Sequence, residues 1–323
     1  MRIGVETFGP QVGSAYLIDP DDHAEGNAPV VEEPDGRMRL RDPDPTAAGD
    51  LPVAFVDGVR RGDARLTISR TGGAMAVGVA GAHGVGAVVC DPGQPPRFHR
   101  LETTRLVVWG EGEHVTLPHV PGGYGWECVS VPTAHPDAPL NALQERMREA
   151  ERRLAETLCA QGLLTIIDGP LHYLRSGDLP VVGYVKTHHR AVLPLDEHHR
   201  VPDLHPGQRT SLFAKRAEIY ACYLRLADPP PWGGPWTGIV RLDLPGAAGI
   251  ANAATAADNA ALLLPRYASV AHRDDRAPVN LQPVGALESR LRHLLGDAAL
   301  AVRAIRAAAT QVTAAPGVGS NAP

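Results

Sequence analysis

Two aspartates in this sequence each follow a run of apolar residues, and each precedes a glycine. Asp57 ends the stretch Val53–Asp57, and Asp168 ends the stretch Leu163–Asp168. Apolar runs that stop at a turn residue are typical of short buried strands. A single Asp-Gly pair is more often a strand-terminating turn than a chemical site. Two such pairs on either side of one predicted helix favour a site, because a sheet can then bring both carboxylates together.

A helix rich in carboxylates is predicted between these two strands. The segment Pro139–Gln161 repeats apolar residues at helical spacing, and Gly162 lies just past its end. Its glutamates are Glu145, Glu149, Glu151 and Glu156. Most of them must be solvated or paired with arginines of the same helix. Composition alone does not choose which glutamate faces the two strand ends.

Three carboxylates held close together repel one another unless cations bind between them. Mg²⁺ and Mn²⁺ are hard ions that prefer oxygen ligands. A pair of such ions can activate water and stabilise the leaving oxygen of a phosphodiester. Carboxylates on separate elements of a rigid sheet therefore point to metal-dependent phosphodiester hydrolysis.

The elements that would position these residues form a single predicted α/β domain. Strands are also predicted at Leu66–Arg70, Met75–Ala80, Val85–Cys90, Leu101–Trp109, Pro180–Lys186 and Thr237–Leu244. Further helices are predicted at Arg209–Leu226, Ala251–Leu264 and Val284–Thr310. In a ribonuclease H-like mixed central sheet flanked by helices, the first strand and the strand after the first helix are neighbours. The helix between them packs across the sheet, so the aspartates and one helix glutamate would converge.

Three segments of the chain differ in composition. Residues 1–50 are rich in Pro and Asp and are expected to form a loosely structured N-terminal extension. Residues 51–312 are expected to form the folded domain. Residues 313–323 are rich in Ala, Pro and Gly, which predicts a disordered tail.

Composition and motifs exclude several classes of protein. A net charge of −5 argues against a coat protein that binds nucleic acid by bulk charge. No phosphate-binding GxxxxGK[ST] loop occurs, so the chain is not itself a P-loop ATPase. The four cysteines form no CxxC pair, which argues against a zinc ribbon. The absence of a signal-peptide pattern and of any apolar run of membrane-spanning length predicts a cytoplasmic protein.

Several segments around these residues resemble the NurA nuclease family. They are Val56–Gly58, Met147–Glu151, Ile167–Leu171, Gly183–Lys186 and Tyr267–His272, the last of which fits the family's C-terminal tyrosine and histidine. The resemblance runs from about Pro52 to about Asp297. The order and spacing of the segments carry it, because no single motif is specific.

This resemblance implies a ribonuclease H-like fold and a Mn²⁺- or Mg²⁺-dependent deoxyribonuclease that uses two ions. The expected activity is that of a 5′-to-3′ exonuclease or single-strand endonuclease on single-stranded DNA and duplex ends, in end processing or repair. The expected partners are DNA, a second copy of the chain in a homodimer, and a HerA-type hexameric ATPase.

The resemblance also assigns roles to individual residues. Asp57, Glu151 and Asp168 would hold the metal ions; Glu151 is preferred over its neighbour Glu149 because it follows the Met-Arg pair at the family's spacing. His272 would be a fourth ligand, contact the phosphate or take part in proton transfer. Two further catalytic candidates are Tyr267, as a companion of His272, and Lys186, which would contact a phosphate or steady the attacking water.

Two departures from the family's pattern keep other hypotheses open. Val59-Arg60 follows Asp57-Gly58 where family members commonly have a small hydroxyl residue, and the stretch His272–Asn280 is unlike that of the archaeal members. One alternative is an inactive ribonuclease H-like scaffold that binds DNA or an ATPase ring. A weaker one is an Argonaute-like guide-binding module, for which the chain is short.

Other residues that could contact DNA have simpler interpretations. Phosphate contacts are conceivable for Arg209, Lys215, Arg216, Arg225 and Arg241, although most would form the solvated face of a helix. Trp232 and Trp236 could stack on bases or pack their Pro/Gly-rich loop onto the body. The pairs His188-His189 and His198-His199 have no zinc-site spacing and predict a polar loop.

Overall fold

A computed structural model describes residues 1–7, 26–46, 51–70, 73, 75–171, 180–187, 191–216, 218–247, 249–270, 272, 274 and 276–314. The strands are β1 Arg2–Thr7, β2 Leu40–Arg41, β3 Val53–Ser69, β4 Met75–Cys90, β5 Arg97–Trp109, β6 Glu127–Ser130, β7 Leu164–Asp168, β8 Val181–Val185, β9 Arg209–Thr210, β10 Phe213–Arg216, β11 Ile219–Arg225 and β12 Ile239–Pro245. The helices are α1 Ala138–Ala160, α2 Leu195–His198, α3 Gly249–Leu263, α4 Gln282–Leu294 and α5 Ala298–Ala314, with 3₁₀ turns at Val201–Asp203 and Leu264–Tyr267.

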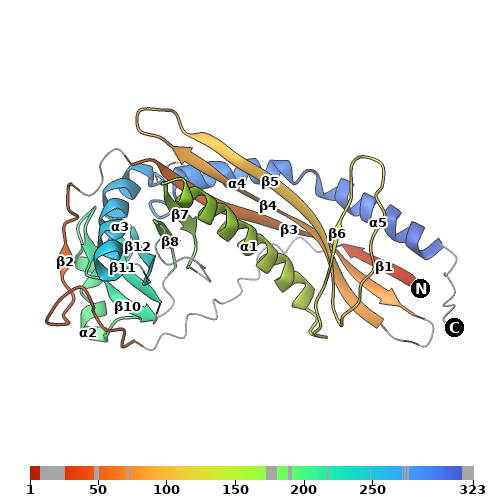
Figure 1. The fold of residues 1–323 in the computed structure, drawn as a ribbon, viewed down its shortest axis with the longest axis horizontal. Coiled ribbons are helices and arrows are strands. Elements are labelled where there is room, and N and C mark those ends of the chain that lie inside the picture. Colours follow the sequence, from red (N-terminus) through yellow and green to blue (C-terminus); the bar gives the residue numbers. More distant parts are fainter. Residues whose placement is uncertain are drawn as a thin grey trace.

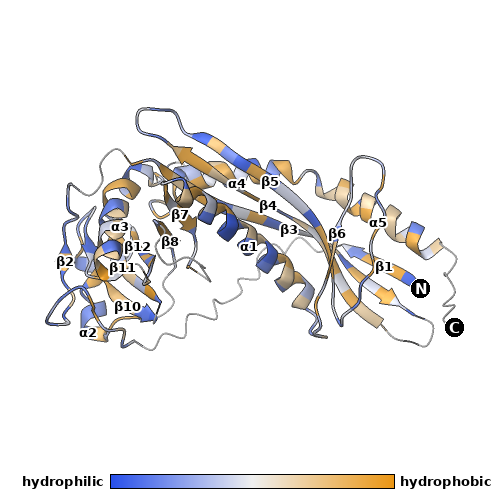
Figure 2. Cartoon of the chain, in the orientation of Figure 1, coloured by the Kyte–Doolittle hydropathy of each residue, from blue (hydrophilic) through white to orange (hydrophobic). Residues whose placement is uncertain are grey.

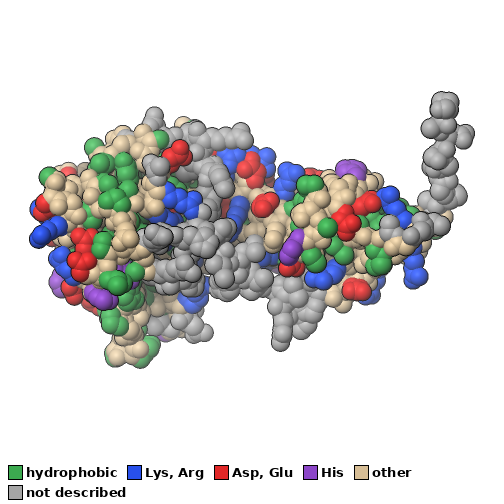
Figure 3. Space-filling view, turned by 90° about the horizontal axis from the view of Figure 1, so that it is seen from below, with side chains coloured by type: hydrophobic (Ala, Val, Ile, Leu, Met, Phe, Trp, Pro, Cys, Tyr) green, Lys and Arg blue, Asp and Glu red, His purple; other side chains and the backbone are tan. Residues whose placement is uncertain are grey.

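The described strands form one mixed sheet, so the fold is of the α/β class. Its main order is β2-β9-β11-β12-β8-β7-β3-β4-β5-β6, with β1 beside β3 and β10 beside β11. The molecule is elongated: β1, β5, β6 and α5 extend toward one end, and β8 to β12 with α3 lie at the other (Figure 1). The face seen in Figure 3 carries acidic and basic side chains intermixed, in keeping with the modest net charge.

Three long antiparallel strands replace the shorter strands predicted from the sequence. β3, β4 and β5 have 17, 16 and 13 residues. The predicted turn at Gly58 is wrong, because β3 continues through it and Gly58 pairs with Val85 of β4. Glycines inside these strands allow close packing rather than turns: a Cβ at Gly81 would lie 2.6 Å from the carbonyl oxygen of Arg61.

The parallel part of the sheet has the arrangement expected from the sequence. β3 pairs in parallel with β7, from Val53 opposite Leu164 to Val56 opposite Ile167. β7 pairs in parallel with β8, and α1 packs across β3, β4 and β7. The two strands that carry the predicted aspartates are therefore neighbours, and the helix between them in sequence crosses over both.

The two faces of β3 are covered by different helices, because alternate side chains of a strand point to opposite sides. Ala54 and Val56 pack with the apolar residues of α1. Phe55 and Val59 pack with α3 and with Leu287 of α4. The outward side of α1 is hydrophilic, as expected for an amphipathic helix that covers a sheet (Figure 2).

Several predicted elements were wrong in the second half of the chain. The helix predicted at Arg209–Leu226 is replaced by β9, β10 and β11. Its apolar residues include β-branched and aromatic side chains, which suit strands, and β11 is buried along most of its length. The single helix predicted at Val284–Thr310 is two helices, α4 and α5, separated near Gly296, whose φ is 76°.

The predicted terminal extensions are partly ordered. Residues 2–7 form β1, which pairs with the far part of β3 and contacts α5, so a loose structure was wrong for them. Residues 26–46 include β2 and pack at the other edge of the sheet. Thr313 and Ala314 belong to α5, and the rest of the predicted tail lies outside the described residues.

Candidate metal centre

Asp57 and Asp168 lie side by side where β7 ends and β3 continues. The last paired residues are Val56 and Ile167, so each aspartate is the next residue along its strand. Neighbouring residues of parallel strands point to the same face of the sheet. Asp57 is only 7% exposed, and its Oδ2 atom has no hydrogen-bond partner among the described residues. The orphaned oxygen of a buried carboxylate calls for a cation or water that the protein itself does not supply.

Glu288 of α4 reaches the two aspartates from the α4 side of the sheet. One carboxylate oxygen from each of Asp57, Asp168 and Glu288 lies within 4.8 Å of the other two. Glu288 was not among the site residues predicted from the sequence, although a signal was present. In α4 the buried Val284, Leu287 and Leu291 form the apolar stripe, and Glu288 occupies a position within that stripe. Glu288 is half-buried there and also accepts a hydrogen bond from Arg292 of the same helix at 2.8 Å.

Glu151 of α1 approaches from the opposite side of the sheet and lies against Gly58. It is 7% exposed, and the Gly58 backbone N–H donates a hydrogen bond to its carboxylate. A Cβ at position 58 would collide with Glu151 Oε1 and lie 2.9 Å from Met147 Cγ. The absence of a side chain at Gly58 therefore lets Glu151 come close to β3. The role of this glycine is close packing, and not the turn inferred from the sequence.

Glu151, rather than Glu149, is the α1 glutamate directed toward the aspartates. The charge of Glu151 raises the pKa of Asp57, which shows their proximity. Glu149 instead accepts hydrogen bonds from Arg152, at 2.6 Å and 3.0 Å. Glu151 nevertheless lies outside the closest carboxylate group among the described residues, which Asp57, Asp168 and Glu288 form.

Burial and mutual repulsion raise the pKa values of these carboxyl groups. Burial raises the pKa of Asp57 well above its ordinary value, and the charges of Asp168, Glu151 and Glu288 raise it further. Burial and the charge of Asp168 raise the pKa of Glu151 to about 8. Burial also raises the pKa of Asp168, against the opposing effect of Lys186. A divalent cation would relieve this repulsion, and the all-oxygen donor set suits Mg²⁺ or Mn²⁺.

Lys186 lies beside the carboxylates, just after β8. Its Nζ atom is 2.6 Å from Asp168 Oδ2, and its side chain is 11% exposed. This ion pair neutralises part of the site in the metal-free protein. A cavity of about 160 Å³ opens next to it, lined by Asp57, Glu151, Asp168 and Arg148 among others. Such a volume accommodates several waters or hydrated ions.

The two C-terminal candidates are not brought into the carboxylate group. His272 is exposed and, among the described residues, is not part of that group. Tyr267 packs edge-on against Phe55, with ring centroids 4.9 Å apart. Burial, together with the nearby Cys90 thiol, raises the pKa of Tyr267 to about 12. Arg276, from the same C-terminal region, is close enough for its charge to lower the pKa of Asp168.

Most of the cations considered as phosphate contacts are used inside the fold. Arg209 is buried and pairs with Glu32 at 2.8 Å and with Asp258 at 2.5 Å. Lys215 and Arg241 both pair with the fully buried Asp243. Arg225 donates to backbone carbonyl oxygens of Thr237, Pro202 and Pro235. Interpreting these residues as the solvated face of a helix was wrong, because they belong to a buried part of the sheet.

The predictions for the two tryptophans of the Pro/Gly-rich loop and for the histidine pairs are only partly tested by the structure. Trp236 packs against His198, with ring centroids 4.6 Å apart, and against Tyr223 at 5.5 Å. Trp232 is 79% exposed. The predicted packing of the loop onto the body therefore holds for Trp236. His188 and His189 lie outside the described residues.

No protein-family model matches this chain, and no curated protein is detectably similar to it. None of the described helices combines the length and apolar character needed to cross a membrane. The chemistry of the site therefore follows from its own residues.

Proposed function

We propose that the chain is a divalent-metal-dependent nuclease that hydrolyses phosphodiester bonds in DNA. The observation that carries this proposal is the convergence of Asp57, Asp168 and Glu288 within 4.8 Å, with one Asp57 oxygen buried and unpartnered among the described residues. Glu151 adds a fourth acidic group from the other side of β3. Hard cations bound to such oxygens are the usual means of hydrolysing phosphodiesters.

Each residue has a role that its position supports. Asp57 would be the central ligand, because its carboxylate oxygen lies within 4.8 Å of those of Asp168 and Glu288 and it lines the same cavity as Glu151. Glu288 and Asp168 would complete the group that holds a cation. Lys186 pairs with Asp168 and would move toward a substrate phosphate when a metal ion takes its place. Bound Mn²⁺ or Mg²⁺ would supply an activated water and neutralise charge on the phosphate.

The fold supports the same proposal. The order β5-β4-β3-β7-β8, with β3 parallel to β7 and α1 across them, supports a ribonuclease H-like arrangement, whereas the NurA family resemblance rests on the sequence alone. Membership of that family, a homodimer, a HerA-type ATPase partner and a cytoplasmic location stay predictions. His272 and Tyr267 stay candidates for roles that require their segment to approach the metal centre.

The proposal is tested by Mn²⁺-dependent cleavage of end-labelled single-stranded and duplex DNA. Asp57→Asn and Glu288→Gln each remove a charged ligand with little change of shape. Removing a group that only supports a metal ligand costs about 10- to 100-fold, so removing a ligand itself should reduce cleavage by at least about 100-fold. The matched control is Glu145→Gln, an exposed glutamate on α1, which should cut like the wild type. Full activity in Asp57→Asn would overturn the assignment.

One observation favours a second candidate, an inactive scaffold that binds DNA or an ATPase ring. The Lys186 ammonium already occupies Asp168 at 2.6 Å, where a cation would otherwise bind. Calorimetric titration of the protein with Mn²⁺ separates the two candidates. Binding that disappears in Asp57→Asn supports the nuclease, and absence of binding in the wild type supports the scaffold.

A further inference from the structure

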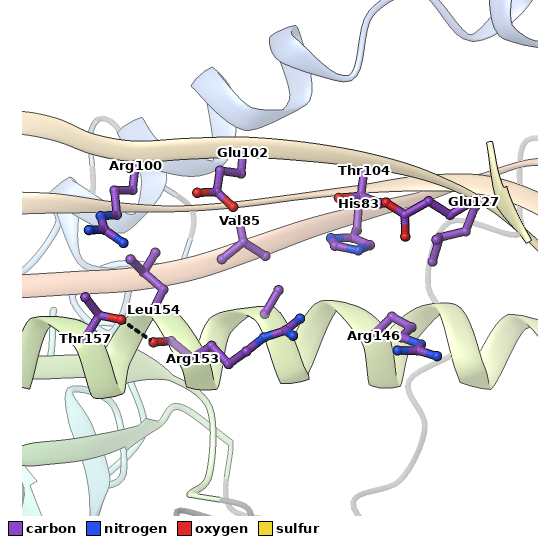
Figure 4. Close-up of a pocket in the computed structure, with 12 residues that line it drawn as sticks. His83, Val85, Arg100, Glu102, Thr104, Glu127, Arg146, Arg153, Leu154 and Thr157 are labelled. Atoms are coloured by element: carbon purple, nitrogen blue, oxygen red, sulfur yellow. Dashed lines mark hydrogen bonds between the residues drawn. The ribbon is translucent and has the colours of Figure 1, made fainter. Parts of the chain in front are cut away.

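A second cavity lies on the other flank of α1, between that helix and strands β4 and β5 (Figure 4). It has a volume of about 340 Å³. Arg146 and Arg153 line it from the helix, and Arg100 lines it from β5. The side chain of His83 projects from β4 into the cavity, toward α1 (Figure 4). Three arginines from two elements make the cavity a candidate anion site.

Its arginines are available to a ligand. Arg146 and Arg153 are seven residues apart, so they lie on one face of α1, two turns from each other. All three arginine side chains are exposed. Neither Arg100 nor Arg146 forms an ion pair with another described residue, and Arg153 has only a 4.0 Å contact with Glu149. These guanidinium groups differ from Arg209 and Arg241, whose charges are used within the fold.

His83 supplies a buried polar atom that lacks a partner. The residue is 6% exposed, and its Nδ1 atom has no hydrogen-bond partner among the described residues. Leaving a buried polar atom without a hydrogen-bond partner is unfavourable. A neutral imidazole can donate from one ring nitrogen and accept at the other. A ligand with oxygen atoms in this cavity would satisfy it.

The backbone of the cavity wall is irregular at Arg100. Its φ is 48°, in the left-handed region that few residues other than glycine adopt. The pairing of β4 with β5 shifts register here, between Val85 and Ala87. Such bulges redirect side chains at the edge of a sheet. β5 therefore departs from regular strand geometry at Arg100, the third arginine of the cavity.

The acidic residues of the cavity restrict the kind of anion that fits. Glu102 and Glu127 also line it, so the formal charge of its lining is only +1 when His83 is neutral, because three arginines face two glutamates. A singly charged phosphodiester suits this balance better than a doubly charged free phosphate. The two carboxylates could accept hydrogen bonds from base amino groups or sugar hydroxyls next to the phosphodiester.

The cavity begins one strand away from the metal centre. Val85, in its lining, pairs with Gly58 in the sheet. Ala150, also in its lining, immediately precedes Glu151. A strand of nucleic acid that crosses α1 from one flank to the other would therefore pass both the arginines and the cavity that Asp57, Glu151 and Asp168 line.

We propose that Arg146, Arg153, Arg100 and His83 bind a non-scissile backbone phosphodiester of the DNA strand on which the metal centre acts. This inference rests on the proposed nuclease function for the identity of the strand. The cavity would bind the substrate without taking part in hydrolysis, because the cavity lined by the metal-binding carboxylates lies on the other flank of α1.

The test is binding of a fluorescently labelled single-stranded oligonucleotide to the full chain in EDTA, followed by anisotropy. The double variant Arg146→Gln/Arg153→Gln should bind at least about tenfold more weakly. The slope of log affinity against log salt should become shallower by about 0.7 for each phosphate that the variant no longer neutralises. The matched control is Arg303→Gln/Arg306→Gln, which removes two exposed arginines from α5 and should bind like the wild type. Equal binding by the two double variants would overturn the proposal.

Two further arms separate the alternatives. Inorganic phosphate is titrated as a competitor of the oligonucleotide. The DNA assignment is overturned if strong competition by phosphate vanishes in Arg146→Gln/Arg153→Gln while this variant binds the oligonucleotide as well as the wild type does. The cavity would then be a site for free phosphate. Failure of DNA cleavage in the wild type, with oligonucleotide binding that still depends on the arginines, would reject the nuclease and keep the strand-binding site.

Discussion

Asp57 is the residue with the least favourable electrostatic surroundings in the candidate metal centre. It is buried, one of its oxygens has no described partner, and three other carboxyl groups act on it. The strand holds it there because its apolar neighbours Phe55 and Val59 are packed on the same face. The fold therefore maintains an unfavourable charge, which is common at functional sites.

Asp57→Asn should make the metal-free protein more stable and abolish stabilisation by Mn²⁺. The amide keeps the shape but removes a buried charge, and the expected gain is about 1–3 kcal/mol. Thermal unfolding with EDTA and with Mn²⁺ measures both effects. Glu145→Gln, on the exposed side of α1, serves as the control and should behave like the wild type. A variant that is less stable in EDTA and still stabilised by Mn²⁺ would contradict a metal role for Asp57.

Stability of the metal-free protein should fall as the pH rises from about 5 to about 8. The pKa of Glu151 is raised from 4.5 to about 8, so in this window the folded chain holds a proton that the unfolded chain has released. The folded state binds more protons, and its stability therefore decreases with pH, by an amount on the order of 3 kcal/mol. Denaturant titrations in EDTA at several pH values measure this slope.

Glu151→Gln should flatten that pH dependence, because the amide does not titrate. Glu149→Gln is the matched control on the same helix, since Glu149 pairs with Arg152 at the surface of α1. Addition of Mn²⁺ to the wild type near neutral pH should release protons, as the ion displaces them from the carboxyl groups. An unchanged slope in Glu151→Gln would show that another group titrates in this range.

At the scale of elements, the contact between β3 and α1 depends on one glycine. Glu151 can approach the strand only because Gly58 has no side chain. In the long strand β3, Asp57 faces α4 and Gly58 faces α1. The strand therefore lies next to a carboxylate on each face, Glu288 on the α4 side and Glu151 on the α1 side. A single-residue shift in register would exchange these faces.

Gly58→Ala should destabilise the protein by about 1–3 kcal/mol, because an added Cβ would meet Glu151 and Met147. It should also weaken Mn²⁺ binding by displacing Glu151. Gly285→Ala in α4 is the control: nothing lies within 4 Å of its added Cβ, and the change should stabilise by about 0.5–1 kcal/mol. Denaturant unfolding and calorimetry check both variants. Equal stability of Gly58→Ala and the wild type would mean that α1 shifts without cost.

At the scale of the whole molecule, buried ion pairs join segments that are far apart in sequence. Arg209 of β9 pairs with Glu32, near the N-terminus, and with Asp258 of α3. Leu212 also donates its backbone N–H to Glu32. These bonds hold residues 26–46 against the edge of the sheet that lies away from the long strands.

Arg209→Met should therefore cost about 3–5 kcal/mol, because it removes the buried partner of both Glu32 and Asp258 and leaves Glu32 only its 3.3 Å ion pair with Arg41. Arg97→Met, which removes an exposed pair with Asp91, should cost less than about 1 kcal/mol. Denaturant unfolding of both variants measures the difference. A similar small effect in the two variants would show that the N-terminal segment is not held by this ion pair.

Local sequence patterns were enough to predict the parts of the site that depend on neighbouring residues. An apolar run before each aspartate predicted the neighbouring strands, and helical periodicity predicted α1 to within one residue at each end. The sequence did not predict the long strands β3, β4 and β5. A glycine that allows close packing inside a strand looks the same in the sequence as a glycine in a turn. The sequence pattern also predicted a helix at β9 to β11, since the preference of apolar runs for strand or helix depends on what covers them.

Contacts between groups that are far apart in the sequence depend on how the whole chain folds. Glu288 lies 120 residues after Asp168 in sequence, and packing of α4 under β3 is what brings the two carboxylates together. In the same way, Arg209 became a buried partner of Glu32, while Arg146 and Arg153 stayed available to a ligand. Periodicity and residue type act over a few positions, whereas a metal centre needs the convergence of elements that only folding of the whole chain provides.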